Sequence, residues 1–160
     1  MPLILTVPQA QGVISSALGL LQIDYPASRR TLMLGTAIQE SGLKAVRQVG
    51  GPALGLWQME SATHDSLWTN FLAYRPHFSA PINHFLNYIE PAAELLTTNH
   101  VYAAAMAALR YYDSKAVMPA NDDVAACAAV WKQYYNTVNG AGTEQEFIDN
   151  YTRMVQDSAT

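Results

Sequence analysis

Apolar residues recur along this chain at intervals of three and four, the period of an amphipathic helix, and strictly alternating runs are nearly absent. The pattern predicts an all-α or mostly α fold, organised as one domain over residues 1–160. Residues 48–60 are glycine-rich and lack helical periodicity, so we expect a loop or short hairpin there. The predicted helices are Pro8–Leu21, Arg29–Ser41, Ser61–Tyr74, Val101–Ser114, Asp122–Asn136 and Glu144–Asp157.

Side chains that cap helix ends support these boundaries. Gly42 is a typical helix terminator, and Glu146 completes a T-x-x-E capping box three residues after Thr143. Prolines at 76, 81 and 91 divide the middle of the chain into short helices. The predicted N-caps are Thr6 or Val7 before the first helix, and then Ser28, Ser61, Asn99, Asn121 and Thr143.

Composition excludes several classes of protein. Charged residues make up 14% of the 160 residues and hydrophobic residues 50%, which excludes a disordered chain and a coiled coil. Nine Lys and Arg against 13 Asp and Glu give a net charge of −4, and no basic cluster exceeds Arg29-Arg30. A dedicated nucleic-acid binder is therefore not expected. The single Cys127 cannot form an internal disulfide, and the four histidines lack metal-ligand spacing, so we expect no metal site and no cofactor.

The amino-terminal segment is apolar but matches no targeting signal. No basic residue precedes Met1–Leu21, and Pro8, Gln9 and Gln11 interrupt it. We therefore expect neither a signal peptide nor membrane insertion. A protein of this kind that acts outside the cytoplasm needs another route of delivery.

One glutamate has the placement of a general acid. Met33, Ala37 and Glu40 fall on one stripe of the second predicted helix, so the carboxyl group shares a face with apolar residues beside the glycine-rich loop. Burial there would raise its pKa, as a general acid at neutral pH requires. The alternative is a boundary glutamate that extends into solvent.

The residues around Glu40 resemble the lysozyme-like superfamily, specifically soluble lytic transglycosylases and goose-type lysozymes. Glu40-Ser41 is similar to their catalytic Glu-Ser pair at a helix end. The later Gly55-Leu56-Trp57-Gln58 is similar to their Gly-Leu-Met-Gln groove motif, with tryptophan in place of methionine. Met59-Glu60 and His64 resemble the Val-Asp and histidine that follow in goose-type enzymes. The resemblance implies a lysozyme-like helical domain with Glu40 as catalytic acid.

A second motif extends the resemblance toward the carboxyl terminus. Tyr134-Tyr135-Asn136, with Gly140 and Gly142 after it, is similar to the family's Ala-Tyr-Asn-Ala-Gly, whose tyrosine hydrogen-bonds the catalytic glutamate. Thr137-Val138-Asn139 departs from that motif, and a core aromatic is the alternative for Tyr135.

The resemblance also assigns a substrate-binding set. Its members are Ser41, to hold the Glu40 carboxyl group; Gly55, for close backbone approach to a saccharide; Leu56; Trp57, as a stacking face or alternatively a core plug; Gln58, as donor and acceptor; His64; and Tyr135.

The distribution of carboxylates bears on the mechanism. No Asp or Glu occurs between Ser41 and Met59, and the nearest second acids are Glu60 and Asp65. An inverting hydrolase needs a second carboxylate, whereas a lytic transglycosylase uses one acid and the sugar's own 6-hydroxyl. The sequence favours the single-acid mechanism, with Glu60 as the catalytic candidate for hydrolysis.

The resemblance implies a substrate and a setting. The substrate is the β-1,4 bond between N-acetylmuramic acid and N-acetylglucosamine in bacterial peptidoglycan. The setting is a phage endolysin, held in the host cytoplasm before release, or a virion-associated lysin with other virion proteins as partners. The alternatives are a chitinase-like hydrolase and a catalytically degenerate structural or glycan-binding module of a virion.

Overall fold

The computed structural model is mostly helical and describes residues 1–24, 26–136 and 140–159. Within these residues there are two isolated bridges, Arg47 with Leu54 and Leu54 with Met59, and no β-strand. The prediction of a mostly α fold is thereby confirmed. The helices are α1 (Val7–Leu21), α2 (Ala27–Ser41), α3 (Ser61–Asn70), the 3-10 turn η1 (Leu72–Tyr74), α4 (Pro76–Phe85), α5 (Leu95–Thr98), α6 (His100–Asp113), α7 (Val124–Trp131), the π-helix η2 (Lys132–Asn136) and α8 (Glu144–Ser158).

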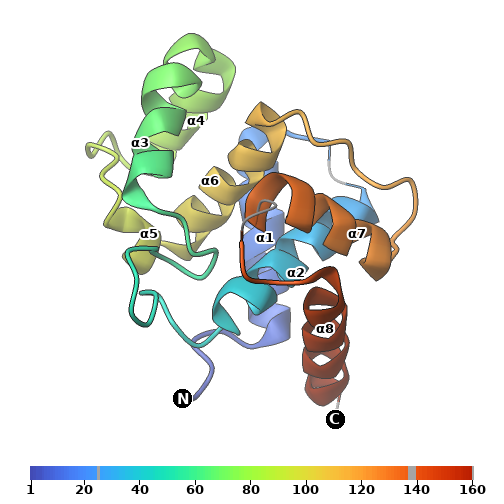
Figure 1. The fold of residues 1–160 in the computed structure, drawn as a ribbon. Helices are drawn as coiled ribbons and strands as arrows, with labels where there is room; N and C mark the ends of the chain where they lie inside the picture. The colour runs from blue at the N-terminus through green and yellow to red at the C-terminus, as the bar shows by residue number, and fades with distance from the viewer. Residues whose placement is uncertain (25, 137–139, 160) are drawn as a thin grey trace.

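Helix α2 is the centre of the packing. It contacts α1, α6, α7 and α8, and every residue from 31 to 38 is buried. Figure 1 shows α3 and α4 at the upper left, on the opposite side of the molecule from α7 and α8. Gly35 of α2 faces the buried Phe147 of α8, whose ring lies 5.4 Å from that of Trp131. The missing side chain at Gly35 is what allows α8 to approach.

Several predicted helix ends are confirmed. Thr6 and Gln9 form a reciprocal capping box at α1, and Gly42 ends α2 in the left-handed conformation at φ 62°. Asn99 accepts from the Tyr102 amide at 3.0 Å, and Thr143 accepts from the Glu146 amide at 3.1 Å. These caps depend on neighbours in sequence, which is why the pattern identifies them.

Other ends differ from the prediction. Ser28 is wrong as an N-cap: α2 begins at Ala27 after Pro26, and the Ser28 hydroxyl is buried without a hydrogen bond among the described residues. Asn121 is also wrong, because Asp123 accepts from the Ala125 amide at 2.9 Å and starts α7. Ser61 is the first residue of α3 instead of its cap.

The middle of the chain differs too. Pro81 lies inside α4 and does not divide it. The predicted helix 61–74 is α3 followed by η1, and the predicted helix 122–136 is α7 followed by η2. Among the described residues, no helix has both the length and the apolar character needed to cross a membrane.

Gly35→Ala should destabilise the fold, because the added Cβ would overlap the Phe147 ring and force α2 and α8 apart. We expect a loss of about 1–3 kcal/mol in the free energy of unfolding, measured by urea denaturation. The matched control is Gly12→Ala in α1, where the added Cβ meets nothing within 4 Å. That variant should gain about 0.5–1 kcal/mol from helix propensity. Equal effects at the two glycines would contradict the proposed close contact of α2 and α8.

Candidate active site

Glu40 lies in the last turn of α2, where the helix emerges from the enclosed core. Its side chain is half-buried, and burial raises its pKa to about 7, against an opposing effect from the Arg110 guanidinium. Loss of solvation by water outweighs the neighbouring positive charge, so the carboxyl group is partly protonated at neutral pH. The predicted desolvated acid is therefore present in the fold.

A cavity of about 420 Å³ opens beside this carboxyl group. Segments that are far apart in sequence meet around this cavity. They are the end of α2, the loop before α3, the start of α3, helix α6, and the end of η2 together with Gly140. Its lining is rich in amide, hydroxyl and charged side chains, which suits a polar ligand. The lining residues are Glu40, Gln48, Ala53, Gln58, Glu60, Thr63, Arg110, Tyr135, Asn136 and Gly140.

Arg110 is a member of this site that sequence reasoning missed. Its guanidinium donates to the Tyr135 carbonyl at 2.7 Å and lies over the Tyr135 ring, 4.1 Å from the centroid. These two contacts fix the charge beside Glu40. A signal was available, because Arg110 is the single Lys or Arg of an otherwise alanine-rich, apolar helix.

Tyr135 lines the cavity with Glu40, but its hydroxyl proton is directed elsewhere. The hydroxyl donates to the Trp57 carbonyl at 2.6 Å, and the ring is buried 5.2 Å from that of Tyr111. The expected bond from Tyr135 to Glu40 is thus replaced by a bond to the loop. Residues 137–139, where the sequence departs from the family motif, lie outside the described residues.

The loop before α3 is held as a narrow hairpin. Leu54 and Met59 exchange backbone hydrogen bonds at 2.9 Å in both directions, around a turn at Gly55. Gly55 has φ 79°, and a Cβ there would lie 2.5 Å from the Leu96 carbonyl oxygen. Gly55 is therefore required for packing against α5, which corrects its predicted role of admitting a saccharide.

Gln58 is the residue of the predicted groove motif that reaches the cavity. Its backbone is left-handed, at φ 49°, and its side-chain amide donates to the Gly55 carbonyl at 2.8 Å. The side chain is half-buried in the cavity wall. Because one donor is held inside the loop, the remaining amide donor and carbonyl lone pairs are the groups available to a ligand.

Leu56 and Trp57 are buried, in contrast to their predicted part in substrate binding. Leu56 is fully enclosed, and the Trp57 indole donates to the Met33 carbonyl of α2 at 2.9 Å. The tryptophan is a core plug that ties the loop to α2. Neither side chain borders the Glu40 cavity.

Ser41 and His64 likewise have structural contacts. The Ser41 hydroxyl donates to the Ala37 carbonyl and accepts from the Leu43 amide, so it completes the helix end and does not hold Glu40. His64 is fully buried, with ring nitrogens 2.6 Å from the Tyr102 hydroxyl and 2.9 Å from Asp65. It packs on the inner face of α3 as a hydrogen-bonded core residue.

The two candidate second acids have different positions. Glu60 is exposed at the start of α3 and borders the same cavity as Glu40. Asp65 points its carboxylate to His64 and does not line that cavity. The fold therefore brings Glu40 and Glu60 together and leaves Asp65 out.

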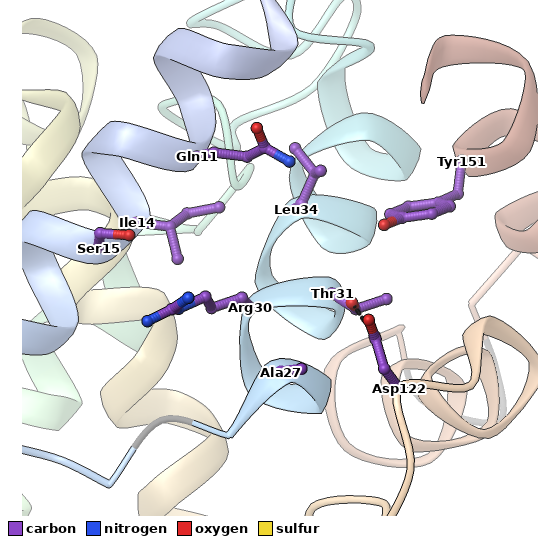
Figure 2. Close-up of a pocket in the computed structure, with 9 residues that line it drawn as sticks. All are labelled: Gln11, Ile14, Ser15, Ala27, Arg30, Thr31, Leu34, Asp122 and Tyr151. Carbon is purple, nitrogen blue, oxygen red and sulfur yellow. Dashed lines mark hydrogen bonds between the residues drawn. The ribbon is translucent and has the colours of Figure 1, made fainter. Parts of the chain in front are cut away.

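A further cavity, of about 410 Å³, lies along the amino-terminal half of α2. Figure 2 shows Gln11, Ile14 and Ser15 of α1 on one side of α2 and Asp122 and Tyr151 on the other. The Thr31 hydroxyl donates to the exposed Asp122, and burial raises the pKa of the Tyr151 phenol. This cavity has no desolvated carboxyl group, so the Glu40 cavity is the candidate active site.

Glu40→Gln should stabilise the protein at high pH. The folded-state pKa of Glu40 lies above its unfolded value, so folding binds a proton between about pH 4.5 and 7, and stability falls as pH rises through that window. At pH 8 the variant should be more stable than the parent by about 3 kcal/mol, with no difference at pH 4. Urea denaturation at both pH values measures this. Glu90→Gln, at an exposed loop glutamate, should show no such pH-dependent gain; equal behaviour of the two variants would argue against the desolvated acid.

Comparison with known proteins identifies no relative. No protein-family model, curated protein or solved structure matches this chain. The resemblance to lysozyme-like enzymes rests on the short motifs around Glu40, Gly55–Gln58 and Tyr135. What the site does chemically is therefore argued from its own side chains.

Proposed function

We propose that this protein is a glycosidase that cleaves the β-1,4 bond between N-acetylmuramic acid and N-acetylglucosamine in peptidoglycan, with Glu40 as general acid and base. The observation that carries the proposal is the Glu40 carboxyl group, with pKa raised to about 7 and placed at the wall of a polar cavity. A general acid works best when its pKa is close to the working pH. The resemblance to lytic transglycosylases supports the choice of substrate.

The other cavity residues suit an acetylated sugar. Gln48, Gln58 and Asn136 border the cavity with side-chain amides, which both donate to and accept from hydroxyl and acetamido groups. Lys132 donates to the Asn136 side chain at 2.8 Å and to the Gly140 carbonyl at 2.9 Å. These bonds hold the segment on either side of residues 137–139 at the cavity.

The bond-breaking step needs one proton from the protein. Glu40 donates its proton to the glycosidic oxygen, the bond from C1 to that oxygen breaks, and the substrate's acetamido group stabilises the positive charge on C1. In the transglycosylase reaction the sugar's 6-hydroxyl then attacks C1, and Glu40 takes up the hydroxyl proton. The product is a 1,6-anhydro sugar, and Glu40 ends the cycle protonated.

Hydrolysis is the second candidate because Glu60 borders the same cavity. In that reaction the Glu60 carboxylate would accept a proton from a water molecule that attacks C1. The phage setting, as an endolysin or a virion-associated lysin, belongs to this proposal and is drawn from the resemblance.

The proposal is tested by incubating the protein with purified peptidoglycan and weighing the released muropeptides by mass spectrometry. Glu40→Gln should reduce release by at least about 100-fold, because it removes the general acid. In the parent, kcat/KM should fall as pH rises above about 7, where Glu40 loses its proton. Glu90→Gln is the charge-matched control. Absence of release by the parent at every pH, with glycan binding unchanged by Glu40→Gln, would favour a non-enzymatic binding module.

A second variant separates the two reactions. If Glu40 acts alone, Glu60→Gln should keep most of the activity and the products should carry anhydro ends. Products with reducing ends, together with a loss in Glu60→Gln comparable to that in Glu40→Gln, would instead establish hydrolysis with Glu60 as base. Chitin oligosaccharides assayed in parallel report whether the enzyme requires the muramic acid substituent.

A further inference from the structure

Three cations converge on one cavity away from Glu40. Arg29 of α2, Arg75 after η1 and Lys115 after α6 line a space of about 410 Å³, and Asp113 is the single carboxylate in its lining. The whole chain has nine Lys and Arg and a net charge of −4, so a third of its cations meet at this point. By contrast, two carboxylates face Arg110 in the Glu40 cavity, and Asp122 balances Arg30 in the cavity of Figure 2.

Arg29 and Arg75 are held by backbone carbonyls, and the Asp24 carboxylate interacts electrostatically with Arg29. The Arg29 Nε donates to the Asp24 backbone carbonyl at 2.9 Å, and Arg75 donates to the Tyr74 carbonyl while lying over the Phe71 ring. Lys115 follows the end of α6 with a left-handed backbone at φ 61°. The ion pairs of Arg47 with Glu94 and of His64 with Asp65 do not involve this cavity.

An exposed aromatic ring borders the same space. Tyr112 is 43% exposed, and its ring is fixed by edge contacts with Phe71 at 6.2 Å and Phe78 at 5.1 Å between centroids. Tyr112 therefore presents a partly exposed aromatic ring to the space that the cations line. Sugar rings and other rings with apolar faces pack on such surfaces.

We propose that this cavity binds the phosphate group of a phosphorylated sugar, with the sugar ring against Tyr112. Three cations against Asp113 in the lining and Asp24 beside Arg29 leave a net positive charge of one, opposite in sign to a phosphate monoester, which carries about −1.5 to −2. Two guanidinium groups suit a tetrahedral oxyanion, because each presents a planar pair of donors.

The proposed phosphate site is independent of the proposed glycosidase activity. Its lining shares no residue with the Glu40 cavity. The two proposals therefore fail separately: Glu40→Gln should leave phosphate binding unchanged, and loss of the phosphate site says nothing about the bond-breaking step. The binding experiment is accordingly run on the full chain in both the parent and Glu40→Gln.

The experiment is calorimetric titration at low ionic strength with glucose 1-phosphate, inorganic phosphate and glucose. Glucose 1-phosphate should bind most tightly, inorganic phosphate more weakly, and glucose undetectably. Arg75→Gln and Lys115→Gln, at exposed positions, should each weaken glucose 1-phosphate binding about tenfold, the effect of one charge-assisted hydrogen bond. Arg153→Gln on α8 removes the same charge elsewhere and should bind like the parent. Tyr112→Leu should weaken binding of glucose 1-phosphate and leave inorganic phosphate unaffected.

Further ligands identify the source of the phosphate. Tighter binding of a poly(glycerol phosphate) chain than of glucose 1-phosphate would point to a phosphodiester wall polymer, and the reverse order to a free sugar phosphate. Equal affinity of Arg75→Gln, Lys115→Gln and Arg153→Gln for glucose 1-phosphate would overturn the site. A single-stranded DNA oligonucleotide that binds more tightly than either phosphate ligand, through Arg75 and Lys115, would overturn the sugar assignment in favour of nucleic acid.

Discussion

Enclosure of α2 by four other helices is the constraint on which the rest of the structure depends. Residues 31–38 of α2 are buried on all sides, which leaves no solvent for polar side chains in this stretch, so each needs an internal partner. Thr36 meets this need through the Leu32 carbonyl at 2.6 Å and the Tyr111 hydroxyl at 2.8 Å. Gly35 removes a side chain where Phe147 must fit. Glu40 follows this enclosed stretch directly, which places a carboxyl group at the exit of the core.

One chain of hydrogen bonds connects that core to the cavity wall. Arg110 of α6 donates to the backbone of Tyr135, the Tyr135 hydroxyl donates to the backbone of Trp57, and the Trp57 indole donates to the backbone of Met33 in α2. The acceptors are backbone carbonyls, so this series of hydrogen bonds fixes the positions of whole backbone segments and not only of single side chains. Tyr135 lies in the π-helix η2, whose wider turn is often found at functional sites.

The sequence predicts local features of this protein better than contacts between distant segments. Thr6, Asn99 and Thr143 were identifiable as caps because a cap bonds an amide two or three residues later. Ser28 fits the same rule, but α2 begins earlier than predicted, at Ala27. Ser28 therefore lies inside the helix, where it is buried by packing. Glu40 and Gln58 border the same cavity, as expected if the Glu-Ser and Gly-Leu-Trp-Gln motifs contribute to one site.

The roles of several site residues could not be read from sequence. Whether Trp57 faces a groove or the core depends on Met33, 24 positions earlier, and His64 is enclosed by Tyr102, 38 positions later. Arg110 is the converse case, a site residue that the sequence does not point to. A cation near the end of an apolar helix is visible in the sequence, but its contact with Tyr135, 25 positions later, is not.

The negative net charge is a weaker constraint on ligands than it first appears. At physiological salt the Debye length is about 8 Å, so a ligand in a cavity responds mainly to the charges that line that cavity. The cavity of Arg29, Arg75 and Lys115 is positive in a protein of net charge −4, whereas two carboxylates and Arg110 line the Glu40 cavity. A glycan strand and a phosphate group would thus be drawn to different places on one small fold. Glu40 itself illustrates the same principle, because local desolvation raises its pKa even though the Arg110 guanidinium acts in the opposite direction.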